Sequence, residues 1–559
     1  MSDTTLGSTV ERSLPQERSA LDWFLTLGIV LVALIASLLG AGSLVVTGMG
    51  TDTISELVVL YSPLSGAGWA VKIGLSLVVL VLLVALAVLV VRYAERIPER
   101  LAVGLCVGAT AVVGVAWVLL NRTQVNLFAD AQQLVVFAQQ VSQGDMQLFS
   151  PHTEVFADKL LGDLYLSNYP YQSGIFLFFV GVARLVGPSH LVRALQLINV
   201  LAAAATVWLA YRCAAEIYPQ RKDVRLLAVL LAASCLPSVL FVVFPYGNAL
   251  GFALALAAVA VVLHAMNRAG RRARLGWLAL AGTVMLLALV IKPTFTIIAG
   301  GLVLMCAVWG LRRRWVLEVA ASVVAFGLAV VLSGIVPVHA VEDLLGYSLP
   351  ANPPKTAWIA MGLRDDGILG PEAPGWWSPS AINSQAEHDG KLAAQESDAR
   401  ASIVRSLAGF AHDPAYAARF FAKKLATEWL DPSFQSLYIA SIGQRDTGAL
   451  FEPRQRGTLH GTLVSAAAFF MDGFQSFVFV GAALGGIAVL RRRHEGYRAI
   501  EFVLPCLFFL GFGVYVLWEA KGMYTLPFFM LLLPLAARGW AAVGERILER
   551  IYGSGDIAR

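Results

Sequence analysis

The stretch LAVGLCVGATAVVGVAWVLLNRTQVNLFADAQQL, residues 101–134, joins an uncharged apolar run to a polar segment that contains Asp130. The run at 102–120 is about long enough to cross a bilayer as a helix, which takes roughly 20 apolar residues. Similar runs recur along the whole chain of 559 residues, which is 58% hydrophobic and only 14% charged. A soluble domain cannot hide that much apolar surface, so the sequence predicts an all-α polytopic membrane protein.

Twelve apolar runs have the length of a membrane span. They lie at about 23–47, 70–92, 102–120, 194–211, 227–244, 249–266, 275–291, 294–311, 316–336, 463–490, 499–518 and 524–541. Arginine clusters follow every second run, and the alternate loops are poor in basic residues. Positive clusters mark cytoplasmic loops, so we expect a multi-pass plasma-membrane protein with both termini in the cytoplasm. These clusters also account for the net charge of +5, so this charge does not indicate a nucleic-acid partner.

The segment 172–190 is apolar but interrupted by Arg184, Gly187 and Pro188. Counting it as a span would invert the side of every later loop. We therefore interpret it as a short re-entrant or juxtamembrane helix on the outer side. A thirteenth crossing is the alternative interpretation.

The runs and loops divide the chain into six parts. These are a cytoplasmic tail (1–22), two additional spans (23–100), a core (101–336) with a first outer loop at 121–171, a mixed extracytoplasmic segment (337–462) with a helical stretch expected at 397–429, C-terminal spans (463–541) and a second cytoplasmic tail (542–559). The five cysteines lie in or next to apolar runs, so we expect neither a disulfide nor a metal site of the CxxC kind.

The first outer loop begins with an amphipathic pattern. Asp130, Gln133 and Gln140 recur at steps that return to nearly the same side of a helix, and an apolar stripe adjoins them. This pattern is typical of a helix that lies along the membrane surface. Water can keep a carboxylate ionised there, beside lipid headgroups, so Asp130 is a candidate catalytic base. The structural alternative is that Asp130 only favours the helix dipole.

Further polar groups follow at the outer ends of the predicted spans. They are Asp145, Tyr169, Tyr171, Gln172, Arg193, Tyr246, Asn248, Lys292, Glu519, Lys521 and Tyr524. Ionisable groups at that depth are costly and usually functional, so their common placement predicts a site on the outer face. Each has a structural alternative: Asp145 after Gly144 suits a turn, and Lys292 can extend to the interface. Trp376 and Trp377 suit either sugar stacking or an interfacial belt.

The order of these pieces resembles the GT-C superfamily of glycosyltransferases. The resemblance is to the bacterial protein O-mannosyltransferase-like and aminoarabinose-transferase-like group, glycosyltransferase family 39. It rests on the acid of the first outer loop, Tyr169-Pro170, Gly187-Pro188-Ser189, Lys292-Pro293-Thr294, and the set Glu519, Lys521, Tyr524 and Pro527. It covers about residues 100–336 and 463–541. Many relatives carry a second Asp where this chain has Asn248, so a second acid there and a divalent metal are left open, and no metal ligand is predicted.

The resemblance implies a GT-C fold and an inverting glycosyltransferase active outside the cytoplasm. The donor would be a hexose or pentose on a polyprenyl phosphate, and the acceptor an envelope glycan, a glycolipid or a protein. Asp130 would be the general base, and Lys292, with Arg193 and Lys521 as weaker candidates, would bind the donor phosphate. Gln133, Asp145, Tyr169, Tyr171, Gln172, Tyr246, Asn248, Glu519 and Tyr524 would contact the sugar or the acceptor. The composition suggests a high-GC bacterium, where arabinosyl or mannosyl transfer is a natural guess.

A transporter or lipid-linked-sugar flippase is the rival interpretation, because transporters also have about twelve spans. They commonly show repeated halves with polar sites at mid-membrane. This chain shows no matching halves, its polar groups lie at span ends, and one outer segment exceeds a hundred residues. A structural subunit with a degenerate site is a third interpretation.

Overall fold

The computed structural model describes residues 20–45, 66–121, 127–128, 130–146, 162–367, 370–388, 390–442, 459–492 and 497–553. Every regular element in these ranges is helical, and none is a strand. The prediction of an all-α protein is therefore confirmed. Most of the N-terminal tail, the end of the C-terminal tail and residues 147–161 of the first outer loop lie outside the described residues.

The helices of the N-terminal half are α1 (Ala20–Val45), α2 (Gly66–Tyr93), α3 (Glu99–Asn121), α4 (Asp130–Ser142), α5 (Gly162–Asn168), α6 (Ser173–Val186), α7 (Leu191–Ile217), α8 (Lys222–Ser234), α9 (Leu236–Leu240) and α10 (Asn248–Met266). Next come α11 (Arg271–Ile291), α12 (Thr296–Arg313), α13 (Val316–Leu345), α14 (Lys355–Gly362), α15 (Ser380–Glu387), α16 (Leu392–His412), α17 (Pro414–Leu425) and α18 (Ser436–Ile442). The last four are α19 (Leu459–Arg491), α20 (Val503–Leu517), α21 (Gly522–Leu531) and α22 (Leu533–Tyr552).

Ten helices in the described ranges are long and apolar enough to cross a membrane, and two bent pairs bring the number to as many as 12. The pairs are Lys222–Ser234 with Leu236–Val243, bent by 46°, and Gly522–Leu531 with Leu533–Tyr552, bent by 49°. They coincide with the predicted spans at 227–244 and 524–541. The chain is thus a multi-pass membrane protein. Helix α6 has only 14 residues, so its length favours the short-helix interpretation of 172–190 over a thirteenth crossing.

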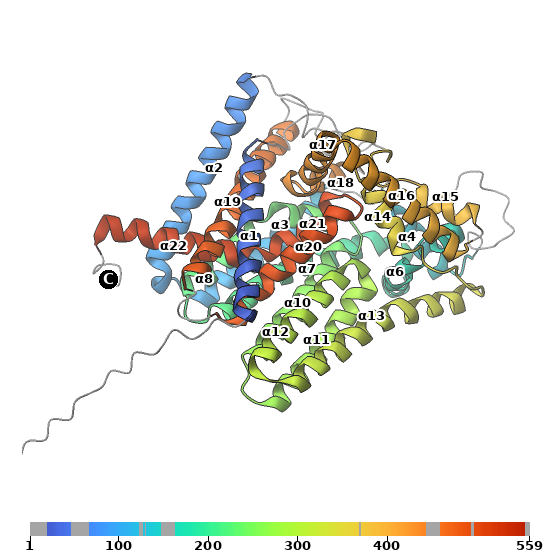
Figure 1. The fold of residues 1–559 in the computed structure, drawn as a ribbon, viewed down its shortest axis with the longest axis horizontal. Helices are drawn as coiled ribbons and strands as arrows, with labels where there is room; N and C mark the ends of the chain where they lie inside the picture. The colour runs from blue at the N-terminus through green and yellow to red at the C-terminus, as the bar shows by residue number, and fades with distance from the viewer. Residues whose placement is uncertain are drawn as a thin grey trace, which may run out of the picture.

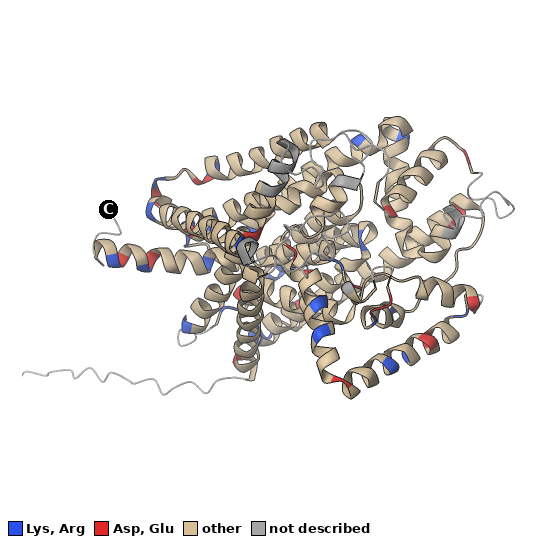
Figure 2. Cartoon of the chain, turned by 90° about the horizontal axis from the view of Figure 1, so that it is seen from above, with Lys and Arg blue, Asp and Glu red and all other residues tan. Residues whose placement is uncertain are grey.

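The arginine-rich turns meet at one end of the bundle, together with residues near both chain ends. Arg312 in the last turn of α12 pairs with Asp22 at the start of α1, at 2.8 Å. Arg221 before α8 pairs with Glu545 of α22, also at 2.8 Å. In Figure 2 most helices of the bundle carry no charge along their middle, and charged residues gather near their ends. The turns that the sequence assigns to one side of the membrane therefore share one end of the structure.

Different sets of helices pack together in two parts of the bundle. Helices α10, α11, α12 and α13 pack side by side (Figure 1). Helices α1 and α2, the two spans predicted to be additional, pack on α19 and α22 instead. Helices α4 and α6 pack on each other, as do α14, α15 and α16, and both groups appear at the right of Figure 1. The ends of α10, α11 and α20 that lie opposite the arginine-rich turns carry the candidate site.

The long connection, defined as the described residues 346–442 between α13 and α19, consists of helices and loops without a strand. The mixed character expected for this part is therefore not seen there. The helical stretch predicted at 397–429 consists of two successive helices, α16 and α17. Asp413 breaks it, because its carboxylate caps the amide of Tyr416 at 2.8 Å and Pro414 begins the next helix. Helix α13 continues through Pro337 to Leu345.

Helices α19 and α22 approach closely through glycine. A side chain at Gly485 would overlap the backbone oxygen of Leu535, and one at Gly539 would overlap that of Gly481. Gly481 and Gly485 form a G-x-x-x-G pair, the pattern that lets helix backbones meet in membranes. The Trp540 indole fixes the register by donating to the backbone oxygen of Phe477 at 2.8 Å.

Replacing Gly485 by Leu should destabilise the protein by about 1–3 kcal/mol or more, because the added atoms force α19 and α22 apart. Thermal unfolding in detergent measures this effect. Gly276→Leu on α11 is the matched control, since nothing lies within 4 Å of a side chain added there. Equal melting temperatures of the two variants would contradict the close-packing interpretation.

Candidate active site

Tyr246 connects two of the predicted site residues by hydrogen bonds. Its hydroxyl donates to Asp130 Oδ2 at 3.1 Å and accepts from Gln172 Nε2 at 2.6 Å. Burial first, and then the charge of Asp130, raise the pKa of Tyr246 well above its usual value. The hydroxyl therefore keeps its proton at neutral pH and holds the half-buried carboxylate of Asp130 at the start of α4.

Glycines explain why these segments meet. A side chain at Gly247 would overlap the backbone oxygen of Ile291, and one at Gly174 would overlap that of Val290. Only glycine allows the loop before α10 and the start of α6 to lie against the end of α11. That contact brings Tyr246 and Gln172 to Lys292.

Lys292 is a buried cation between aromatic rings, with 7% of its surface exposed. Its Nζ lies 3.9 Å from the ring centroid of Tyr246 and 5.3 Å from that of Tyr524. No ion pair of Lys292 occurs within the described ranges. Burial lowers its pKa to about 7, and the charge of Asp130 opposes that shift. Buried charges are normally paired, so this ammonium group is suited to receive an anion.

The loop between α20 and α21 adds an ion pair to the site. Glu519 Oε1 and Lys521 Nζ are 2.9 Å apart, and both side chains are nearly buried. Lys521 Nζ also lies 5.1 Å from the ring centroid of Trp376 and 5.6 Å from that of Tyr524. Lys521 is thus already neutralised by an ion pair, whereas Lys292 forms none within the described part of the chain.

Tyr169 and Tyr171 flank the same carboxylate. Burial raises the pKa of both hydroxyls, and the charge of Asp130 contributes to each shift. Their ring centroids are 5.9 Å apart. The structure thus brings nine of the predicted residues together. They are Asp130, Tyr169, Tyr171, Gln172, Tyr246, Lys292, Glu519, Lys521 and Tyr524.

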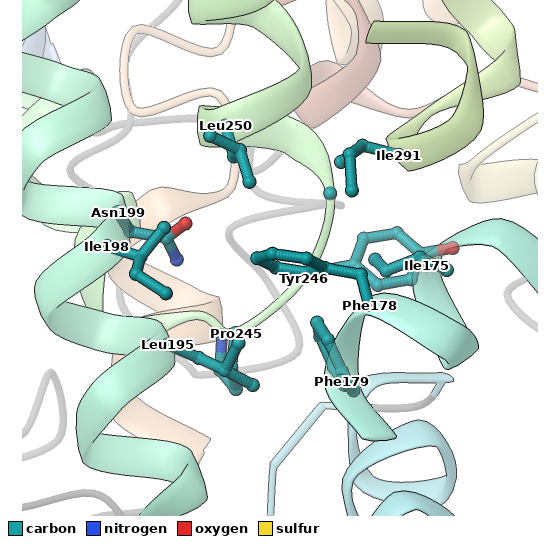
Figure 3. Close-up of a pocket in the computed structure, with 11 residues that line it drawn as sticks. Ile175, Phe178, Phe179, Leu195, Ile198, Asn199, Pro245, Tyr246, Leu250 and Ile291 are labelled. Atoms are coloured by element: carbon teal, nitrogen blue, oxygen red, sulfur yellow. The ribbon is translucent and has the colours of Figure 1, made fainter. Parts of the chain in front are cut away.

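An apolar pocket borders this group. Figure 3 shows the ring of Tyr246 between α7, which supplies Leu195, Ile198 and Asn199, and α6, which supplies Ile175, Phe178 and Phe179. The Asn199 amide fixes the wall of the pocket by donating to the backbone oxygen of Phe244 at 2.8 Å. The site therefore combines charged groups with an apolar recess beside them.

Four predicted residues have other surroundings. Arg193 donates to the backbone oxygen of Val118 near the end of α3, at 2.6 Å. Asp145 lies past the other end of α4, where its amide and that of Gly144 cap the helix. Gln133 lies one turn beyond Asp130 and is partly buried. Asn248 lines a second apolar pocket, and its amide atoms have no hydrogen-bond partner in the described part of the chain.

Metal-binding residues do not gather at this site. Among the described residues, the group able to hold a metal ion is Glu387, His388 and Asp398, at the surface of α15 and α16. His388 Nε2 and Asp398 Oδ2 already bond at 2.7 Å. The groups around Asp130 can accept a proton, bind an anion or donate hydrogen bonds from hydroxyls.

Lys424 was not predicted from the sequence, yet it holds part of the site. This fully buried residue of α17 donates to the backbone oxygens of Gly362 at 2.6 Å and Trp518 at 2.7 Å. The amide of Ala520 donates to Gly375 at 2.8 Å beside this junction. The long connection thereby fixes the loop that carries Glu519 and Lys521. In the sequence Lys424 follows Lys423 on an amphipathic helix, so nothing distinguishes it from a surface residue.

Lys424→Met should lower the melting temperature and slow any reaction at this site about tenfold or more. The Gly362 and Trp518 oxygens would lose their buried donor, at about 1–3 kcal/mol each, and small displacements of a site loop cost rate steeply. Thermal unfolding and activity at matched protein levels measure both effects. Lys423→Met, at the neighbouring position, is the control and should behave like wild type. Identical behaviour of the two variants would show that Lys424 does not hold the loop.

Comparisons with known proteins give distant likenesses only. No family model and no curated protein matches the chain. The archaeal oligosaccharyltransferase AglB from Archaeoglobus fulgidus, in complex with an inhibitory peptide and a dolichol-phosphate, is similar at 13% identity, with a TM-score of 0.37, over 81% of this chain and 52% of that chain.

Two further structures of an Archaeoglobus fulgidus oligosaccharyltransferase are similar to the same degree. One is tethered to an acceptor peptide containing the NVT sequon, with 13% identity, a TM-score of 0.39 and coverage of 80% of this chain and 50% of that one. The other is a complex with Zn and sulfate, with 14% identity, a TM-score of 0.38 and coverage of 81% and 52%. This chain spans about half the length of these structures, and the likeness assigns it neither a family nor an activity.

Proposed function

We propose that the protein is an inverting glycosyltransferase of the GT-C kind that takes a hexose or pentose from a polyprenyl phosphate. The observation that carries this proposal is the arrangement around Tyr246. Its hydroxyl binds the carboxylate of Asp130, and its ring faces the ammonium group of Lys292. A base therefore contacts the hydroxyl of Tyr246, and a buried cation without an ion pair among the described residues contacts its ring. Transfer from a lipid phosphate requires both groups.

Asp130 and Lys292 would have separate roles in the reaction. The acceptor oxygen attacks the anomeric carbon of the donor, and Asp130 takes the proton from that oxygen. The bond between the anomeric carbon and the phosphate oxygen breaks, and polyprenyl phosphate leaves with the bonding electron pair. Lys292 offsets the negative charge that grows on the phosphate. Attack from the side opposite the leaving group inverts the configuration.

Other residues of the site would bind and orient the substrates. Gln172 keeps the Tyr246 hydroxyl directed at Asp130, and Tyr169 and Tyr171 would donate to sugar hydroxyls. The apolar pocket between α6 and α7 would take the first part of the lipid chain. Because the arginine-rich turns lie at the opposite end of the bundle, the site would face the extracytoplasmic side of the plasma membrane. The acceptor would be an envelope glycan, a glycolipid or a protein.

Donor consumption tests this proposal. Membranes that contain the protein should release polyprenyl phosphate from a labelled polyprenyl-phosphate sugar and pass the label to an acceptor, whereas membranes without it should not. Arabinose and mannose donors are the first to compare. Recovery of an intact donor that has crossed the bilayer would instead support a lipid-linked-sugar flippase.

A further inference from the structure

Four aromatic side chains lie close to Asp130, and the chemistry above gives a role only to the hydroxyl groups of two of them. The ring centroids of Tyr169 and Tyr171 are 5.9 Å apart, and those of Tyr171 and Trp358 are 6.1 Å apart. Trp358 and Trp377 pack against the same apolar cluster of buried residues. We call these four residues, Tyr169, Tyr171, Trp358 and Trp377, the aromatic wall. Two of them precede α6, and the other two come from the long connection.

The aromatic wall is accessible and adjoins the proposed base. Each of its four side chains is only partly buried. Gln172, the neighbour of Tyr171 in the chain, donates to the Tyr246 hydroxyl, which in turn donates to Asp130, so the wall lies close to the carboxylate. An interfacial belt distributes its rings around the lipid-facing surface. These rings instead come from segments almost 190 residues apart in the sequence and contact one another beside the site.

Polar atoms without partners border the wall. The Tyr165 hydroxyl and the Trp376 indole nitrogen are buried and form no hydrogen bond within the described residues. Tyr165 contacts Tyr169, with ring centroids 5.2 Å apart, and Trp376 precedes Trp377 in the chain. A buried polar group without a partner is costly. A ligand that carries hydroxyl groups would satisfy both atoms.

We propose that the aromatic wall is the acceptor subsite and that its occupant is a neutral glycan. This inference rests on the proposed glycosyltransferase function and narrows its acceptor. A sugar ring offers a face of C–H groups to an aromatic ring and an edge of hydroxyls to nearby polar atoms, which matches the wall and its border.

The charges near the wall favour a neutral glycan over an acidic one. An acidic glycan would need a free cation. Lys521 is paired with Glu519, and Lys292 is reserved for the donor phosphate. The hydroxyl of a glycan bound on the wall would lie within reach of Asp130.

Binding and kinetics of Trp358 variants test the proposal. The probes are neutral mannose and arabinose oligosaccharides with a fluorescent label, and a Ser/Thr-containing peptide with the same label. Trp358→Ala should weaken oligosaccharide binding, measured by fluorescence polarisation without donor, and raise the acceptor KM about tenfold. The donor KM should stay within about twofold of wild type, since no contact joins Trp358 to Lys292, the proposed ligand of the donor phosphate, in the described structure. Trp358→Phe should restore most of the loss, because it keeps an aromatic face.

Trp208→Ala is the matched control, since Trp208 is 47% exposed on α7 and lies outside the wall. The inference is overturned if Trp358→Ala leaves both oligosaccharide binding and acceptor KM unchanged. It is also overturned if the peptide binds and no oligosaccharide does. Oligosaccharide binding that depends on Trp358, without donor consumption by wild type, would uphold the aromatic wall and refute the proposed transfer.

Discussion

Replacing Asp130 by Asn is expected to slow sugar transfer by about 10²–10⁴-fold, which is what a positioned general base contributes. The Asn side chain has nearly the same shape, and its oxygen can still accept the hydrogen bond of Tyr246. Donor binding should therefore remain close to wild type while the chemical step fails. Initial transfer rates in membranes with matched protein levels measure the effect.

The control for this variant is Asp145→Asn. Asp145 lies past the opposite end of α4, where its backbone caps the helix, so its variant should transfer sugar at nearly the wild-type rate. Equal rates for the Asp130 variant and wild type would remove Asp130 as the base. Glu519 would then be the next acid to test, because it lies in the same site.

Replacing Lys292 by Met is expected to slow transfer by about 10²–10³-fold. Removing one preorganised group that stabilises developing charge typically has this effect, and Met fills a similar volume between the rings of Tyr246 and Tyr524. Lys521→Met is the comparison, and its effect should be smaller because Lys521 is neutralised by Glu519. A larger loss in the Lys521 variant would assign the donor phosphate to Lys521 instead.

Lys292 should also make the rate of sugar transfer depend on pH. Burial lowers the pKa of Lys292 to about 7, so its ammonium form, which the donor phosphate needs, is lost as pH rises through that value. The kcat/KM for the donor should therefore fall above about pH 7, since this ratio reports the free enzyme. Lys292→Arg should move this fall to higher pH, because a guanidinium group stays protonated. A flat profile up to pH 9 in wild type would contradict this role.

The membrane architecture could be predicted from the sequence because it depends on local properties. Span length follows from the thickness of the bilayer, and the arginine clusters identified turns that share one end of the bundle. Even the two bent pairs were found as single apolar runs, since a bend at Cys235 or Leu532 does not change hydropathy. The amphipathic period also predicted the helix that contains Asp130, Gln133 and Gln140, which is α4.

Most of the site followed from one assumption, that polar groups at the same ends of neighbouring spans converge. This assumption grouped Asp130, Tyr246, Lys292 and Glu519 without any knowledge of their contacts. It did not separate them from Arg193, whose guanidinium binds the end of α3. Nor did it identify Lys424 and Trp358, since their partners Trp518 and Tyr171 lie 94 and about 190 residues away. Contacts over that distance depend on packing that no local pattern encodes.

The most direct test is the fate of the anomeric bond of the donor in liposomes that contain the purified protein. A polyprenyl-phosphate sugar labelled at the anomeric carbon is incubated with an acceptor and either wild type or Asp130→Asn, and the product is examined by NMR. We expect wild type to give a glycoside of inverted configuration together with free polyprenyl phosphate, and the variant to leave the donor intact. Retained configuration, or an intact donor moved across the bilayer by wild type and variant alike, would contradict an inverting transfer with Asp130 as its base.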